Sequence, residues 1–244
     1  MSIRAPRLRT YRSIKKALEE DRKELEAFFE KSGVYPTSQI AEIEIAFKRA
    51  HKAVYSLCLW SHEFSDFPIH QKVFLEELRS DVLQSFPMAL LGFKKPVALL
   101  LRSAIEDLLR HIYYFDHKIE FEKLEKKPSS YELMNDLWQY ARKHPRLEKI
   151  FEKSNVIASL ENDYAVFSRF VHSTSTFHMN LTKSMSEIGF DVEFFEKYGS
   201  NVSTLAKRIH FVLFTFCCKS IEGFNPPWTS FLLDILSKQY RKLL

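Results

Sequence analysis

The chain has 244 residues, of which 45% are hydrophobic and 14% aromatic, which is enough for one large core or two small ones. Its five glycines are too few for glycine-rich phosphate loops, dinucleotide folds or β-sandwiches, and neither Gly-x-Gly-x-x-Gly nor Gly-Lys-Ser/Thr occurs. The net charge of +5 is a mild bias toward phosphate-rich partners.

The apolar periodicity indicates a succession of helices. The predicted helices cover residues 7–32, 37–64, 68–92, 96–124, 129–144, 160–175, 203–221 and 229–243. Pro87 lies inside the third of these patterns, where a proline removes a hydrogen bond, so we expect a kink or a break there. Periodicity fades near 176–199, which predicts a short irregular segment.

This order of elements predicts an all-α protein. We expect an up-and-down helical bundle over residues 71–244, with a helical N-terminal extension over residues 1–70 packed on it. The three cysteines have no metal-type spacing, which is typical of free thiols in a reducing compartment. The apolar runs are shorter than the roughly 20 residues of a membrane span, and the N-terminus lacks a signal-peptide core. We therefore expect a cytoplasmic protein with no membrane segment.

The predicted helix over 96–124 carries a polar strip beside its apolar stripe. At 100° per residue, four further side chains fall within about 80° of Arg102, and they are Glu106, Arg110, Tyr113 and His117. His111 falls near the edge of the apolar sector, where packing is the alternative to ligand binding. The strip has two interpretations. One is a solvated ladder of i, i+4 ion pairs, worth about 0.2–0.5 kcal/mol each. The other is a site, because arginine suits phosphate or carboxylate and histidine titrates near neutrality.

A second strip follows in ENDYAVFSRFVHSTSTFH. Tyr164, Ser168 and His172 are spaced four apart and share a helix face, and Arg169 lies three residues before the histidine. Each residue is ordinary alone. A histidine placed against the carboxylate of the first strip would have a raised pKa and a fixed tautomer.

Together the two strips resemble the HEPN superfamily of small α-helical domains. The pattern is an Arg-x-x-x-Glu helix followed by a Tyr-x-x-Phe-Ser-x-x-x-His helix, and it is most similar to abortive-infection and other bacterial defence proteins. The resemblance covers residues 78–216, and the matching residues are Arg102, Glu106, Tyr164, Phe167, Ser168 and His172. The catalytic signature of the superfamily is Arg, a short spacer that begins with a polar residue, and His. Arg110 to His117 fits that wording, with His111 as the polar residue, but on the Arg/Glu helix rather than on a late one.

The resemblance implies a metal-independent RNase that acts as a homodimer. His117 or His172 would be the general acid or base, and Arg102 or Arg110 would hold the phosphate, with Glu106 as an orienting group. The implied binding residues are His111, Tyr113, Tyr164, Ser168 and Arg169. The implied partners are RNA, a second copy of the chain, and an antitoxin or other defence-system protein. No metal or cofactor is expected.

Two other hypotheses stay open. The chain could be a non-enzymatic HEPN-like module that binds RNA, a nucleotide or a partner protein, or it could be a purely structural helical adaptor. The geometry of the two strips separates the catalytic hypothesis from the binding hypothesis. An open cleft where arginine and histidine converge would favour catalysis, whereas buried and mutually satisfied pairs would favour binding.

Overall fold

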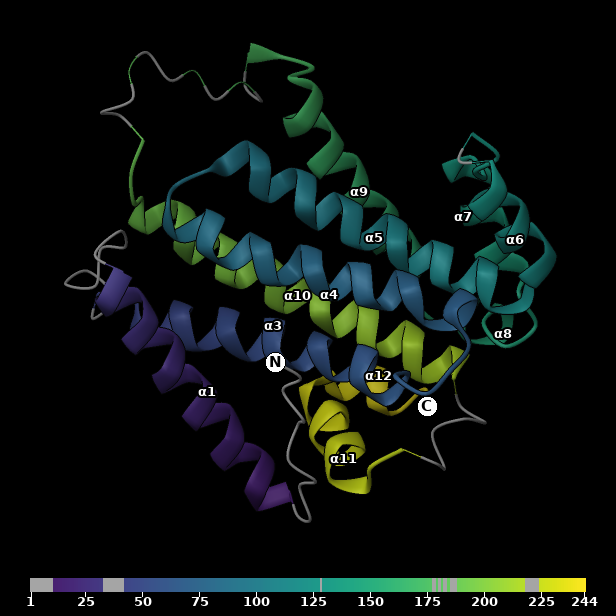
Figure 1. Cartoon of the computed structure of the whole chain (residues 1–244), viewed down its shortest axis with the longest axis horizontal. Coiled ribbons are helices and arrows are strands. Elements are labelled where there is room, and N and C mark those ends of the chain that lie inside the picture. The colour runs from purple at the N-terminus through teal and green to yellow at the C-terminus, as the bar shows by residue number, and fades with distance from the viewer. Residues whose placement is uncertain are drawn as a thin grey trace.

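The computed structural model describes residues 11–32, 42–127, 129–176, 179, 181, 184, 188–217 and 224–244. All regular secondary structure in these residues is helical, so the predicted all-α class is confirmed (Figure 1). The helices are α1 (Tyr11–Ser32), α3 (Glu44–Glu63), α4 (Ile69–Leu90), α5 (Lys94–Asp116), α6 (Lys118–Lys126), α7 (Met134–Lys143), α8 (Glu148–Phe151), α9 (Val156–His172), α10 (Val192–Phe216), α11 (Pro226–Ile235) and α12 (Lys238–Arg241).

Helices α3, α4, α5, α9 and α10 form an up-and-down bundle. Short connections join α3 to α4 and α4 to α5, so each pair is antiparallel and packs closely. Helix α9 runs antiparallel to α5, because Lys95 meets Ser173 at one end and Arg102 meets Tyr164 further along. None of the described helices has a stretch long and apolar enough to cross a bilayer.

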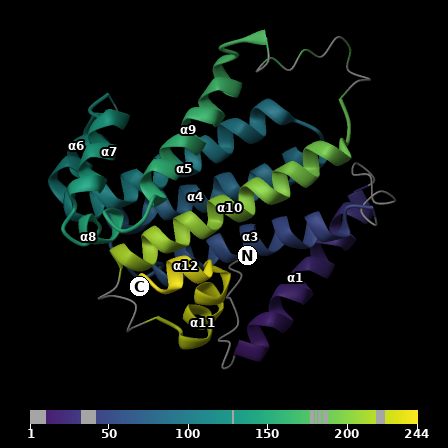
Figure 2. The same ribbon diagram turned by 180° about the vertical axis from the view of Figure 1, so that it is seen from behind.

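Helix α10 is the centre of the bundle and contacts α3, α4, α5 and α9 (Figure 2). It lies close to α3 at Gly199, where an added Cβ would lie 2.9 Å from the carbonyl oxygen of Ala46. Further along, the indole N–H of Trp60 donates to Nδ1 of His210 at 2.8 Å, and Ser56 Oγ lies 2.8 Å from Nε2. The two helices therefore run parallel, joined by a buried polar cluster.

The other helices cover the ends and one side of the bundle. Helix α1 packs against α3 and α11, and its Phe29 is buried against Phe86 with the ring centroids 6.2 Å apart. Helices α6, α7 and α8 gather at one end of the bundle (Figure 1). The expected boundary after residue 70 falls in the first turn of α4, and this helix contacts α3. The division into 1–70 and 71–244 stays a prediction.

The predicted helix over 96–124 is wrong, because two helices occupy this range. They meet at His117, whose backbone angles of φ −114° and ψ 64° are not helical. The ring of His117 replaces a backbone N–H as the donor to the carbonyl of Tyr113, since its Nδ1 lies 2.7 Å from that carbonyl oxygen. Helix α5 also begins earlier than predicted, at Lys94.

The irregular segment is shorter than 176–199, because α10 begins at Val192. The carboxylate of Asp191 caps this helix by accepting a hydrogen bond from the backbone N–H of Phe194 at 2.9 Å. Such a cap satisfies a free N–H group of the first turn. The residues from 218 to 221, where the sequence predicted the end of this helix, lie outside the described part.

Prolines and caps account for the remaining differences. Pro87 does not end α4, which continues to Leu90, because a proline in the last turn removes only one hydrogen bond near the helix end. The predicted terminal helix over 229–243 is two helices separated at Leu236, and the first begins at Pro226, where a missing N–H is tolerated. Helix α7 begins at Met134, not at residue 129.

Candidate functional site

The two predicted polar strips meet between α5 and α9. Nη2 of Arg102 donates to the hydroxyl of Tyr164 at 2.8 Å and lies 2.7 Å from Oε1 of Glu106. The same hydroxyl donates to Oε1 of Glu106 at 3.1 Å. The guanidinium of Arg102 also lies over the ring of Tyr164, 5.0 Å from its centroid. The three side chains are therefore bonded to one another, and Nε of Arg102 is buried without a hydrogen-bond partner among the described residues.

Arg110 extends this cluster toward α4. Its Nη2 lies 3.4 Å from Oε2 of Glu106, and its Nη1 lies 3.2 Å from Oδ1 of Asp107. The side chain of Asp107 is only 2% exposed, and burial raises its pKa to about 7 although Arg110 favours the charged form. Both arginines of the strip are thus held by carboxylates of their own helix.

The histidine and serine of α9 do not join this cluster. His172 is the exposed last residue of α9, about two helical turns beyond Tyr164. Its neighbour Ser173 lies beside Lys95 near the start of α5, well before the position of Arg102. Oγ of Ser168 is buried and has no hydrogen-bond partner among the described residues. The structure therefore does not bring Arg102 and His172 together within one chain.

His117 is also separate from the arginines. Its ring stacks on that of Tyr113, with the centroids 4.2 Å apart and an interplanar angle of 2°, and it meets Tyr140 edge-on. The carbonyl of Tyr113 can only accept, so Nδ1 of His117 is the donor in this contact. No interaction between His117 and Arg110 occurs in the described part of the chain.

His111 packs in the core. The sequence analysis gave this as the alternative to ligand binding. His111 is fully buried, and its ring meets those of Phe64, Phe115 and Phe216. Neither ring nitrogen has a hydrogen bond of good geometry among the described residues, and burial lowers the pKa of His111 to about 3 against the smaller opposing effect of the nearby Gln71 backbone. A ligand cannot reach this side chain in the observed conformation.

Replacing His111 with phenylalanine should stabilise the protein. At pH 7 the gain should be about 1–3 kcal/mol, the typical penalty for a buried polar group without a partner. The pKa of His111 is lowered in the folded state. Below pH 6.5 the unfolded chain therefore binds a proton at His111 that the folded chain does not bind. Stability is lost as the pH falls, so the advantage of the variant should grow by about 1.4 kcal/mol per pH unit.

Urea denaturation at pH 7 and pH 5 measures both effects. His111→Leu serves as a smaller replacement, in case phenylalanine is too large for the site, and the exposed His172→Phe is the control. If both His111 variants are less stable than the wild type at pH 7 and at pH 5, the buried imidazole has a stabilising partner and this account is wrong.

The sequence did not indicate a second histidine cluster, at the C-terminal end of α5. Oδ2 of Asp116 accepts from Nε2 of His144 at 2.9 Å and from the hydroxyl of Tyr140 at 3.1 Å. The backbone N–H of Arg146 donates to Nδ1 of the same histidine at 3.2 Å. Both ring nitrogens of His144 therefore form hydrogen bonds, and the bond to Asp116 holds the end of α7 against the end of α5. No spacing in the sequence connects residues so far apart.

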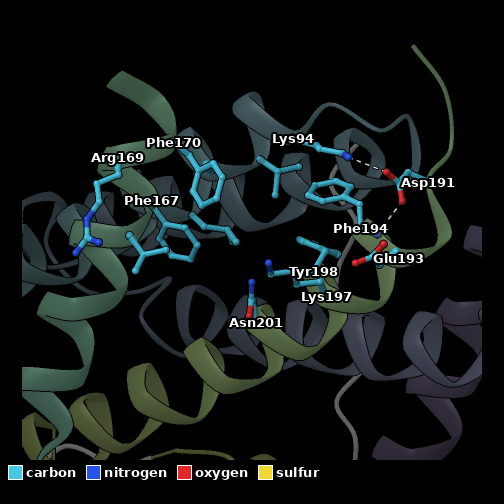
Figure 3. Close-up of a pocket in the computed structure, with 14 residues that line it drawn as sticks. Lys94, Phe167, Arg169, Phe170, Asp191, Glu193, Phe194, Lys197, Tyr198 and Asn201 are labelled. Carbon is cyan, nitrogen blue, oxygen red and sulfur yellow. Dashed lines mark hydrogen bonds and ion pairs between the residues drawn. The ribbon is translucent and has the colours of Figure 1, made fainter. Parts of the chain in front are cut away.

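A groove of about 460 Å³ lies on another face of α5, between this helix, α9 and the start of α10 (Figure 3). Lys94 and Asp191 form an ion pair of 2.7 Å at one end, and Arg169 lies at the other. Between them lie three phenylalanines. The lining residues are Lys94, Val97, Ala98, Leu101, Val166, Phe167, Arg169, Phe170, Asp191, Glu193, Phe194, Lys197, Tyr198 and Asn201. Arg169 is the predicted site residue that lines this groove.

The groove is apolar at its base and has three basic and two acidic side chains at its edges, of which Lys94 and Asp191 pair with each other. Phe167 is buried and Phe194 half-buried, and the ammonium of Lys94 lies 5.5 Å from the centroid of the Phe194 ring. Arg169 and Lys197 are exposed, and neither forms an ion pair in the described residues. The sequence analysis missed most of this site, because much of the lining comes from residues expected to be irregular.

Comparison of the chain with protein-family models, with curated proteins and with solved structures finds no match. The HEPN resemblance therefore stays a prediction. Within the described residues, no group of three or more histidine, cysteine, aspartate or glutamate side chains is placed to hold a metal ion.

Proposed function

We propose that this chain is a HEPN-like module that acts by binding, and that it takes a nucleotide in the groove between α5, α9 and α10. The observation that carries this proposal is the combination of phenylalanine rings with two exposed cations that form no ion pair in the described residues. A nucleotide offers a flat base and an anionic phosphate, and the groove offers a partner for each.

The chemistry of the lining supports this class of ligand. Stacking on an aromatic side chain is worth about 1–3 kcal/mol per base and tolerates every base. Arg169 and Lys197 are placed to bind phosphate oxygens, for which a guanidinium suits two parallel hydrogen bonds. The volume of about 460 Å³ lies within the usual range of small-molecule sites, about 300–1,000 Å³.

The Arg/Glu cluster favours binding over cleavage. RNA cleavage without a metal needs a base at the 2′-hydroxyl and a cation at the scissile phosphate. Arg102 and Arg110 are engaged with Glu106, and neither His117 nor His172 reaches them within the chain. In our proposal this cluster fixes α5 against α9 and so shapes the wall of the groove. Cytoplasmic localisation, homodimerisation and a defence-system partner belong to the same proposal.

Calorimetric titration with AMP, GMP, CMP and UMP tests the proposal. We expect at least one nucleotide to bind, and we expect Phe194→Ala and Arg169→Gln each to weaken binding by about tenfold, since one lost stacking or charge-assisted contact is worth about 1.4 kcal/mol. Phe28→Ala, an exposed phenylalanine on α1, and Lys153→Gln, an exposed cation near α9, are the matched controls.

The assignment is wrong if none of the four nucleotides binds. Two further results would also contradict it. One is equal affinity in the wild type and both groove variants, which would place the ligand elsewhere. The other is cleavage of RNA by the purified protein that is lost in His117→Ala or His172→Ala. That result would support the metal-independent RNase instead, with the histidine brought to an arginine across a dimer.

A further inference from the structure

A second hollow lies beside α10, on a different face from the groove. It measures about 380 Å³ and opens between α3, α10 and the turn from α11 to α12. Its lining residues are Arg49, Lys52, Ala53, Ser203, Lys207, Asp234, Ile235, Leu236 and Ser237. We call this hollow the basic cleft.

The packing of α3 on α10 assembles the basic cleft. Arg49 and Lys52 are one turn apart on α3, and Ser203 and Lys207 are one turn apart on α10. The two helices approach backbone to backbone at Gly199, one turn before Ser203, which brings these two faces together. The cations therefore come from two elements that are rigidly joined.

The positive charge of the cleft is not balanced by the described part of the protein. Arg49, Lys52 and Lys207 form no ion pair there, although Lys207 is half-buried. The ammonium of Lys52 lies over the ring of Phe231, 5.7 Å from its centroid, which keeps it beside the cleft. Three cations that share one hollow repel one another, and a bound anion would relieve that repulsion.

The one carboxylate among the lining residues, that of Asp234, leaves the cleft with more basic than acidic side chains. Asp234 lies 3.5 Å from Arg241 of α12. By contrast, the cations next in sequence to the cleft residues each have an acidic partner, since Lys48 pairs with Glu44 and Arg208 pairs with Asp163. The absence of a partner is therefore a property of the cleft and not of these helices in general.

From this arrangement we infer that the basic cleft binds a phosphate group. Arginine and lysine supply charge-assisted donors, and the hydroxyls of Ser203 and Ser237 add neutral donors of the kind that contact phosphate oxygens. The cleft has few apolar side chains for a base to stack on, so it recognises the phosphate itself. This site is independent of the nucleotide groove.

Calorimetric titration with pyrophosphate and with inorganic phosphate, at constant ionic strength set with potassium chloride, tests this inference. We expect pyrophosphate to bind, and we expect Lys207→Gln and Arg49→Gln each to weaken binding by about tenfold or more, as a lost charge-assisted contact should. Lys207→Arg should retain binding. The matched control is Lys48→Gln, which removes the same charge one residue from Arg49 but outside the cleft. Circular dichroism confirms that each variant is folded.

A single-stranded RNA oligomer identifies the source of the phosphate. If RNA competes with pyrophosphate and its binding depends on Lys207, the cleft takes phosphodiesters. If RNA does not compete, the cleft takes free phosphate or diphosphate. The inference is overturned if pyrophosphate, inorganic phosphate and RNA all fail to bind. It is also overturned if Lys48→Gln weakens binding as much as the cleft variants do. The groove assignment has its own test, the loss of nucleotide binding in Phe194→Ala, so failure of the cleft to bind pyrophosphate leaves the groove assignment standing.

Discussion

Replacing His210 with alanine is expected to lower the free energy of unfolding by about 3–5 kcal/mol. The imidazole is fully buried and links α3 to α10 through Trp60 and Ser56. Alanine would leave a cavity and also remove the acceptor of the indole N–H, so two penalties add. Guanidinium denaturation followed by tryptophan fluorescence measures the loss.

Ser56→Ala is the graded control for this prediction. The Trp60 N–H donates to Nδ1 of His210, so Nε2 carries the proton and donates to Ser56 Oγ. Removing the hydroxyl leaves that N–H unpaired but opens a much smaller cavity, so we expect a loss of about 1–2 kcal/mol. A loss below about 1 kcal/mol in His210→Ala would show that the cluster does not hold the two helices together.

Asp107→Asn is expected to stabilise the protein above pH 7 and to have little effect near pH 4. Burial first, and then the nearby charges of Asp81 and Glu77, raise the pKa of Asp107 from its ordinary value of 3.8 to about 7. Between these two values the unfolded chain has lost its proton while the folded chain keeps it. Stability therefore falls as the pH rises from about 4 to about 7 and then levels off.

The size of this effect follows from the shift. A raised pKa of this extent corresponds to about 4 kcal/mol at most, and the asparagine variant should recover a large part of it at pH 8. Urea denaturation of both proteins from pH 4 to pH 8 gives the difference in their free energies of unfolding. The titration of other buried groups is common to both proteins and cancels in this difference. The exposed Asp66→Asn is the control and should change stability by less than about 0.5 kcal/mol. Parallel curves for Asp107→Asn and wild type would refute the assignment.

The sequence predicts the helices well because their signals are local. The all-α class followed from periodicity, and so did the shared face of Arg102, Glu106 and Arg110. The sequence analysis did not predict that Tyr164 of the second strip would meet the first strip, which it does through its hydrogen bond with Arg102. A spacing of four residues places side chains on one side of a helix whatever the rest of the chain does.

The other features depend on contacts between distant residues. The break at His117 arises from its stacking on Tyr113 and its bond to a carbonyl, which no propensity records. The pairing of Asp116 with His144 joins two helices far apart in the sequence. The groove was missed for a related reason, since α10 starts early owing to the carboxylate of Asp191. The angular position of an arginine around a helix does not show whether its guanidinium already has an ion-pair partner.

One glycine has an effect on both hollows. Any side chain at position 199 would collide with the backbone at Ala46 and force α10 away from α3. Because α10 forms a wall of the groove on one face and of the basic cleft on another, such a displacement would alter the width of both. The absence of a single methyl group at this crossing thus sets the dimensions of two separate surfaces.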